Sequence, residues 1–136
     1  METVLQLNIP VPNAPSSLAK VGDTLRAANV NILAITCTEG PSQTIIHTVV
    51  DDPETAKIVL KPFGKITTTK VLSFLIKNKP GAIASIGRAL AGAYINIRYI
   101  YATTTGKEAR AYVAVENDET EEALKALEPW KSGLTV

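Results

Sequence analysis

The sequence predicts an α+β protein of two similar units in tandem, each an antiparallel sheet with helices on one face. The main observation behind this prediction is an internal repeat, which emerges when the second half of the chain is moved back by 65 positions. Asparagines, prolines and the apolar positions of a helix then coincide; the matching pairs are Asn78 with Asn13, Pro80 with Pro15, Asn96 with Asn31, Ile83 with Leu18, Ile86 with Val21 and Leu90 with Leu25. Such self-similarity defines the unit of folding.

The first half predicts strands and helices in a definite order. Residues 4–11 alternate apolar and polar side chains, which is typical of a half-buried strand, and a turn at residues 13–16 leads into an amphipathic helix. Residues 31–37 and 44–50 predict two further strands. Asp51-Asp52-Pro53-Glu54 predicts a second helix, because aspartate caps free N–H groups and proline suits the first helical turn.

The second half repeats this order after an uninterrupted stretch. Residues 65–77 contain neither glycine nor proline and are long for one strand, so we expect the last strand of the first unit to run directly into the first strand of the second. The further predicted elements are a helix at 81–93, strands at 95–103 and 109–116, a helix from 118 and a short strand at 134–136. Each half is then a ferredoxin-like βαββαβ unit, with boundaries at 1–69 and 70–136.

Two features of these units predict packing. Gly22 and Gly87 lie at equivalent positions within the first helix of each unit, and we expect another element to approach closely there, since glycine has no Cβ. The second strand of a ferredoxin-like unit lies at the sheet edge, and residues 95–101 are apolar on both faces. Because such an edge promotes aggregation unless it is covered, we expect it to pair with another unit, within the chain or in a homo-oligomer.

Composition and charge exclude several classes of function. The net charge of +1 gives no reason to expect nucleic acid or an anionic membrane as a partner, and no apolar run approaches the roughly 20 residues of a membrane span. Cys37 is the only cysteine, so no intramolecular disulfide can form. The only histidine, His47, has no cysteine or carboxylate at metal-ligand spacing. We expect a soluble cytoplasmic protein without a metal or a cofactor.

The turn Asn78-Lys79-Pro80-Gly81 has the chemistry to hold a free amino acid. The N-terminus of a helix presents unpaired N–H groups and about half a positive charge, which suits a carboxylate. Gly81 lets these amides face a ligand without a Cβ in the way. An asparagine carboxamide carries both a donor and an acceptor, so Asn78 can bridge the carboxylate and the ammonium of an amino acid.

The Asn-x-Pro-Gly turn, Ile83 and the Asn96-Ile97 pair together resemble the ACT domain, a regulatory module that binds amino acids. The resemblance covers nearly the whole chain, and two units joined by an unbroken strand are similar to the stand-alone tandem ACT proteins. In the resembling domains, the asparagine before Pro-Gly and the asparagine that opens the second strand hold the ligand. The ligand-binding residues that the resemblance implies are Asn78, Lys79, Pro80, Gly81, Ala82, Ile83 and Asn96 in the second unit, and Asn13, Ser16 and Asn31 in the first.

A purely structural role stays open for each asparagine. Asn78 and Asn13 can serve only as turn formers, and Asn96 and Asn31 only as the starts of strands. The first unit also departs from the family pattern, because Ser16 stands where the family has glycine. Its Cβ would hinder a close approach to the amides, so we expect the second unit to supply most of the binding.

The resulting hypothesis is a non-enzymatic regulatory protein that senses an amino acid and assembles as a homodimer. Ligand binding at a cleft between units would bias how units or protomers associate. One alternative is the regulatory subunit of a biosynthetic enzyme such as acetolactate synthase, whose small subunit resembles this chain in its N-terminal half. A third is RNA binding, because the RNA-recognition motif shares the strand order, although residues 106–113 contain one aromatic where base stacking needs two or three.

Overall fold

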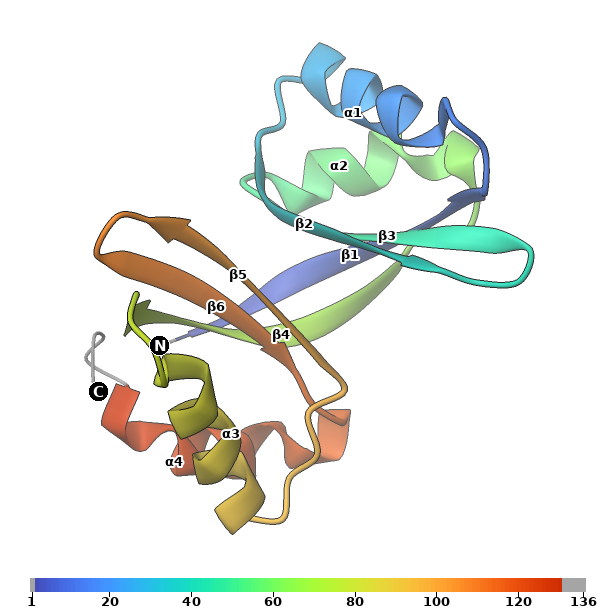
Figure 1. The fold of residues 1–136 in the computed structure, drawn as a ribbon. Coiled ribbons are helices and arrows are strands. Elements are labelled where there is room, and N and C mark those ends of the chain that lie inside the picture. The colour runs from blue at the N-terminus through green and yellow to red at the C-terminus, as the bar shows by residue number, and fades with distance from the viewer. Residues whose placement is uncertain (1, 131–136) are drawn as a thin grey trace. The chain divides into compact units, whose positions relative to one another are not determined.

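A computed structural model describes residues 2–130 and shows two compact units (Figure 1). The N-terminal unit comprises residues 5–69. The C-terminal unit joins the stretch from Lys70 onward to the beginning of the chain up to Val4. The predicted strand at residues 134–136 lies outside the described residues.

The N-terminal unit is an antiparallel sheet with both of its helices on the same face (Figure 1). Its strand order is β2-β3-β1-β4, and β3 pairs antiparallel with both β1 and β2. The elements are β1 (Glu2–Pro12), α1 (Ser17–Ala27), β2 (Ile32–Glu39), β3 (Gln43–Val50), α2 (Pro53–Val59) and the beginning of β4 (Thr67–Lys77). A single 3₁₀ turn, Lys61–Phe63, leads from α2 toward β4.

The C-terminal unit repeats this plan, with strand order β1-β4-β6-β5. β6 pairs antiparallel with both β4 and β5, and β5 is the outermost of the described strands. After β4 come α3 (Ala82–Gly92), β5 (Tyr99–Thr105), β6 (Glu108–Ala114) and α4 (Thr120–Ala126), with 3₁₀ turns at Asn117–Glu119 and Glu128–Trp130.

Two strands supply residues to both units. β4 runs without a break from Thr67 to Lys77, as the absence of glycine and proline predicts, and its first residues belong to the N-terminal unit. β1 begins in the C-terminal unit and continues in the N-terminal unit after Val4. The chain start therefore differs from the sequence-based boundaries, which place it in the first unit.

Each unit has its own core between its helices and its sheet. The N-terminal core contains Leu7, Ile9 and Val11 from alternate positions of β1, together with Val21, Leu25, Ile46, Val50, Ala56 and Leu60. The C-terminal core contains the equivalent apolar side chains, among them Leu72, Phe74, Ile76, Ile86, Leu90, Val113 and Leu127. Burial of one such side chain stabilises a fold by about 1.5–3 kcal/mol. Of the apolar helix positions that the repeat matches, Val21 with Ile86 and Leu25 with Leu90 lie in these cores.

Two expectations about the helices are wrong. Leu18 and Ile83 do not face the core but are 53% and 47% exposed, because Ser17 and Ala82 occupy the buried position of the first turn. At Gly22 and at the equivalent Gly87, an added Cβ would meet no neighbouring atom within 4 Å, so neither glycine marks a close approach.

The end of α3 explains why β5 begins later than predicted. The N–H of Tyr94 donates to Ala91 O (2.9 Å) and the N–H of Ile95 to Leu90 O (2.9 Å), which is the pattern of a Schellman motif. Ile95 is used to close this helix and to fill the core. The strand consequently starts at Tyr99 instead of residue 95.

A Schellman motif also ends α1, but the left-handed residue is an asparagine there and a tyrosine at the end of α3. Asn29 and Tyr94 are the two non-glycine residues with positive φ in the described chain, both at 58°. Asparagine tolerates this left-handed conformation, whereas most L-residues lose roughly 1–2 kcal/mol in it. Tyr94 is 94% exposed, so burial of its ring does not compensate for this strain.

Replacing Tyr94 with asparagine is expected to raise the free energy of unfolding by about 1 kcal/mol, because the strain is relieved and little contact is lost. Urea denaturation measures the change. Tyr94→Phe is the control and should leave stability unchanged. A destabilised Tyr94→Asn variant would show that the exposed ring makes contacts that outweigh the strain.

Asp52 caps α2, as the sequence predicts. Its Oδ1 accepts from the N–H of Thr55 (3.1 Å) and its Oδ2 accepts from the Thr55 hydroxyl (2.7 Å). These hydrogen bonds lower the pKa of Asp52 from its usual 3.8. The stabilising contribution is therefore complete above that value and is lost as the pH falls through the lowered pKa.

We expect Asp52→Ala to lower the midpoint of thermal unfolding at neutral pH, and the difference from wild type to shrink at acid pH as the carboxylate is protonated. Asp52→Asn keeps a capping oxygen that does not titrate, so its difference from Asp52→Ala should not depend on pH. A pH-independent difference between wild type and Asp52→Ala would contradict a role for the charge.

Candidate functional site

The turn between β4 and α3 is anchored to the neighbouring β5–β6 turn. The N–H of Asn78 donates to Lys107 O (2.9 Å), and its side-chain Nδ2 donates to Gly106 O (2.7 Å). Asn78 thus has a structural role, but it tethers two turns rather than forming a local turn of its own. The side-chain Oδ1 makes no hydrogen bond within the described part of the chain and stays available as an acceptor.

Gly81 is the N-cap of α3 and adopts the left-handed conformation, with φ 89°. An added Cβ would meet no atom within 4 Å, yet any side chain at this φ would be strained. Beyond it, the N–H groups of Ile83 and Ala84 make no hydrogen bond within the described residues. The turn therefore offers two free donors at the positive end of a helix dipole, flanked by the exposed Lys79.

The equivalent turn before α1 has a different backbone. Ser16 is its N-cap with φ −92° and ψ −2°, an ordinary conformation for an L-residue. The backbone conformation of each turn therefore explains why the first unit has serine and the second has glycine at this position, without reference to a ligand. Asn13 again acts as a tether, since its Nδ2 donates to Glu39 Oε1 (3.2 Å).

A hollow of about 350 Å³ lies at this N-terminal turn. Its lining includes Ser16, Lys20 and Phe63. Serine and lysine side chains can hydrogen-bond a polar ligand, and the phenylalanine ring offers an apolar surface.

The two candidate asparagines of one unit lie at opposite ends of the sheet. Asn78 adjoins the start of β6, whereas Asn96 comes just before Arg98, whose N–H donates to Ala114 O at the other end of β6 (2.9 Å). A strand of this length separates its ends by roughly 20 Å. One free amino acid cannot contact both residues within a unit, and Asn96 lies in the segment before β5 rather than opening the strand.

Asn13 and Asn31 are separated in the same way along β3. Asn13 follows Pro12, which pairs with Gln43 at the beginning of that strand. Asn31 accepts from the N–H of Asp51 just beyond its end (3.1 Å). Asn31 borders a second, larger hollow at the C-terminal end of α1.

A polar network around His47 is the main feature that the sequence does not predict. Asn8 Oδ1 accepts from Gln6 Nε2 (2.7 Å) and lies 2.9 Å from His47 Nδ1, which Gln6 Nε2 also approaches (3.3 Å). His47 Nε2 lies 3.1 Å from Thr38 Oγ1, and Asn8 Nδ2 donates to Thr69 Oγ1 (2.9 Å). Both ring nitrogens are engaged, so His47 links strands of the N-terminal unit.

Tyr101 and Tyr112 stack in the C-terminal unit, with ring centroids 5.1 Å apart and planes inclined by 14°. Burial raises the pKa of both phenols above the usual value of 10.0. Both therefore stay protonated at neutral pH, and neither supplies a phenolate base.

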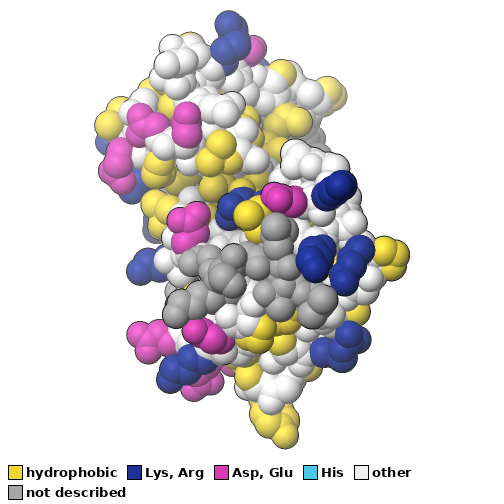
Figure 2. Space-filling model, turned by 90° about the vertical axis from the view of Figure 1, so that its left-hand side faces the viewer, with side chains coloured by type: hydrophobic (Ala, Val, Ile, Leu, Met, Phe, Trp, Pro, Cys, Tyr) yellow, Lys and Arg dark blue, Asp and Glu magenta, His cyan; other side chains and the backbone are white. Residues whose placement is uncertain are grey.

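The surface shows no single dominant charge on the face drawn in Figure 2, where acidic and basic side chains of the described residues are interspersed. The described side chains on this face form no continuous basic surface for a nucleic-acid backbone. Within residues 2–130, no three His, Cys, Asp or Glu side chains gather in a way that could hold a metal ion. No helix among those described is long and apolar enough to cross a membrane.

Comparison with known proteins identifies relatives of the whole chain. A family model described as an ACT domain pair matches residues 2–128. A solved structure of a protein from Bacteroides thetaiotaomicron is 24% identical, with a TM-score of 0.87, over 98% of this chain and 92% of that one. The ligand-free regulatory subunit of aspartate kinase from Thermus thermophilus is 22% identical, with a TM-score of 0.67, over 94% of this chain and 96% of that one. No curated protein matches.

The tether made by Asn78 can be tested separately from ligand binding. We expect Asn78→Ala to lower the free energy of unfolding by about 0.5–1.5 kcal/mol, the usual loss for one hydrogen bond. Asn96→Ala is the matched control, since the Asn96 side chain makes no hydrogen bond within the described chain. Equal losses in urea denaturation would argue against the tether.

Proposed function

Because this chain belongs to the family of ACT domain pairs, we propose that it is a non-enzymatic regulatory protein that binds a free amino acid. The observation that supports a binding site most directly is the turn before α3, where Gly81 leaves the N–H groups of Ile83 and Ala84 open. Regulatory subunits of aspartate kinase among the proteins of similar fold agree with this class of function.

In the proposed complex, the ligand carboxylate accepts from the free N–H groups of Ile83 and Ala84, where the helix dipole favours negative charge. The free Oδ1 of Asn78 accepts from the ligand ammonium, while its Nδ2 keeps the tether to Gly106. The exposed side chain of Ile83 offers an apolar surface to the ligand side chain. The exposed Lys79 adds a positive charge near the carboxylate.

The regulatory response would come from assembly. A ligand changes a protein only by binding one of its states more tightly than another. β5 is the outermost described strand of its unit, and a strand at the edge of a sheet can pair with a second copy of the chain. We propose a homodimer in which this edge is covered and whose stability depends on the ligand.

A second candidate is the regulatory subunit of a larger biosynthetic enzyme. It is favoured by the regulatory subunit of aspartate kinase from Thermus thermophilus, whose fold this chain shares over 96% of that chain's length. Co-purification with a larger catalytic polypeptide would support this candidate over a sensor that acts alone.

A thermal-shift screen with each of the twenty amino acids tests the proposed binding. A ligand at a hundredfold excess over its dissociation constant stabilises the folded state by about 2.7 kcal/mol.

Calorimetry on Ile83→Asp then locates the site, because a carboxylate beside the free amides would repel the ligand carboxylate. Leu18→Asp is the matched control at the equivalent exposed position of α1.

Loss of binding in Ile83→Asp alone would place the ligand at the turn before α3. Equal losses in both variants would make the two turns equivalent, and a loss in Leu18→Asp alone would move the site to the first turn. If none of the twenty amino acids shifts the unfolding midpoint, the proposed function is wrong.

The proposed assembly predicts that the protein sediments as a dimer, with the amides of Tyr99–Thr105 protected from hydrogen exchange on both sides of the strand. Replacing Ala102, an exposed residue of β5, with lysine should shift the protein to a monomer, since charged side chains block edge pairing. A strictly monomeric wild type with a freely exchanging edge would contradict the proposal.

A further inference from the structure

A hollow of about 500 Å³ lies at the C-terminal end of α1, wholly within the N-terminal unit. Three of its lining residues are apolar, and the others include both signs of charge; the residues are Gly22, Leu25, Arg26, Asn29, Val30, Asn31, Ile32 and Asp51. Small-molecule sites combine this volume with an apolar lining and a few polar groups that fix orientation.

Gly22 leaves room on the helix side of the hollow. Glycine inside a helix is less stable than alanine by about 1 kcal/mol, and this one is not needed for packing, since an added Cβ meets no atom within 4 Å. It lines the hollow, so a side chain at this position would project into it.

Asp51 supplies a fixed negative charge. Its Oδ1 accepts from the N–H of Asn31 (2.9 Å), while its own N–H donates to Asn31 O (3.1 Å). It forms no ion pair with any residue in the described range 2–130. The carboxylate borders the hollow at the end of α1, where the helix dipole also favours a cation.

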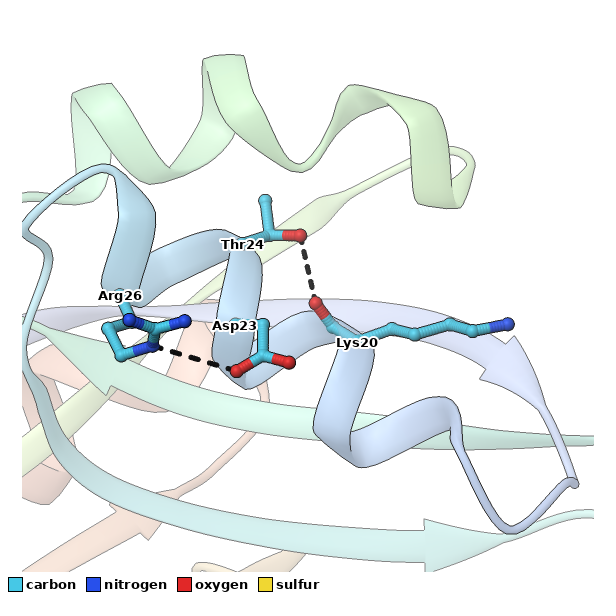
Figure 3. Close-up of polar contacts among 4 residues, drawn as sticks. All are labelled: Lys20, Asp23, Thr24 and Arg26. Atoms are coloured by element: carbon cyan, nitrogen blue, oxygen red, sulfur yellow. Dashed lines mark hydrogen bonds and ion pairs between the residues drawn. The ribbon is translucent and has the colours of Figure 1, made fainter.

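Arg26 supplies the opposite charge from the last turn of α1. Figure 3 shows its guanidinium beside Asp23, with Nε 3.6 Å from Oδ1, while the Lys20 side chain extends away along the helix. This pair is exposed and weak. The planar guanidinium of Arg26 has the geometry that binds a carboxylate through two hydrogen bonds.

The repeat supplies an internal comparison. Ala91 occupies the position equivalent to Arg26, so the C-terminal unit lacks this cation. Glu116, the equivalent of Asp51, is paired with Arg98 (3.6 Å). The N-terminal unit has instead an unpaired acid and a cation on one hollow.

We propose that this hollow is a second amino-acid site, in which Asp51 binds the ammonium, Arg26 binds the carboxylate and the apolar lining contacts the ligand side chain. The ligand class rests on the proposed function, whereas the location does not, because the turn before α3 belongs to the other unit. A chain with both sites binds two ligand molecules.

Calorimetry with each of the twenty amino acids tests the proposal on the full chain. Asp51→Asn keeps an acceptor for the N–H of Asn31 but removes the charge, and Arg26→Gln removes the guanidinium. Each should weaken the second binding event by about tenfold to a hundredfold, as expected for a hydrogen bond to a charged group. Gly22→Leu should abolish it by filling the hollow, while Gly87→Leu at the equivalent place in α3 should not.

The outcomes separate this site from the proposed function. Two bound ligands in the wild type and one in Gly22→Leu support the second site. Binding that resists all three changes in the hollow but is lost in Ile83→Asp overturns the second site and leaves the proposed function intact. If Gly87→Leu reduces binding as much as Gly22→Leu, the effect is on the fold and the second site is wrong. Absence of binding by all twenty amino acids overturns both.

Discussion

Two strands, β1 and β4, supply backbone hydrogen-bonding groups to both units, and the remaining structure depends on their continuity. In each unit, β4 and β1 are neighbours in the strand order, and a hairpin, β2–β3 or β5–β6, completes the sheet. The helices then cover one face of each sheet and close separate cores. A proline within β4 would remove a ladder hydrogen bond and a glycine would weaken the strand, and neither occurs between Thr67 and Lys77.

In each unit, one end of the first helix carries groups that suit the proposed ligand. At the N-terminus of α3, the free N–H groups and the glycine turn suit a carboxylate. At the C-terminus of α1, an aspartate and an arginine border a hollow, and the helix dipole there favours an ammonium. The chemistry of a zwitterion thus matches different helix ends in the two units, although the units share one fold.

The sequence predicts the fold well because the repeat and the period of apolar residues both report burial. The sequence predicts the element boundaries less well where one apolar residue fits two patterns. The pattern around Ile95 predicts the start of a strand, but Ile95 closes a helix instead. Ile83 continues an apolar stripe yet is exposed, because Ala82 fills the buried position. The polar network of His47 and the hollow beside Asp51 join residues distant in sequence, and no local pattern indicates such contacts.

The contribution of β1 to the C-terminal unit is the most direct test of this account. Hydrogen exchange should be measured on a variant from which residues 2–4 are removed. Loss of this segment leaves part of the β4 edge without hydrogen-bond partners, so amides within residues 70–77 should exchange faster while those of β3 keep their protection. Unchanged protection at residues 70–77, or a loss that falls first on β3, would contradict the account.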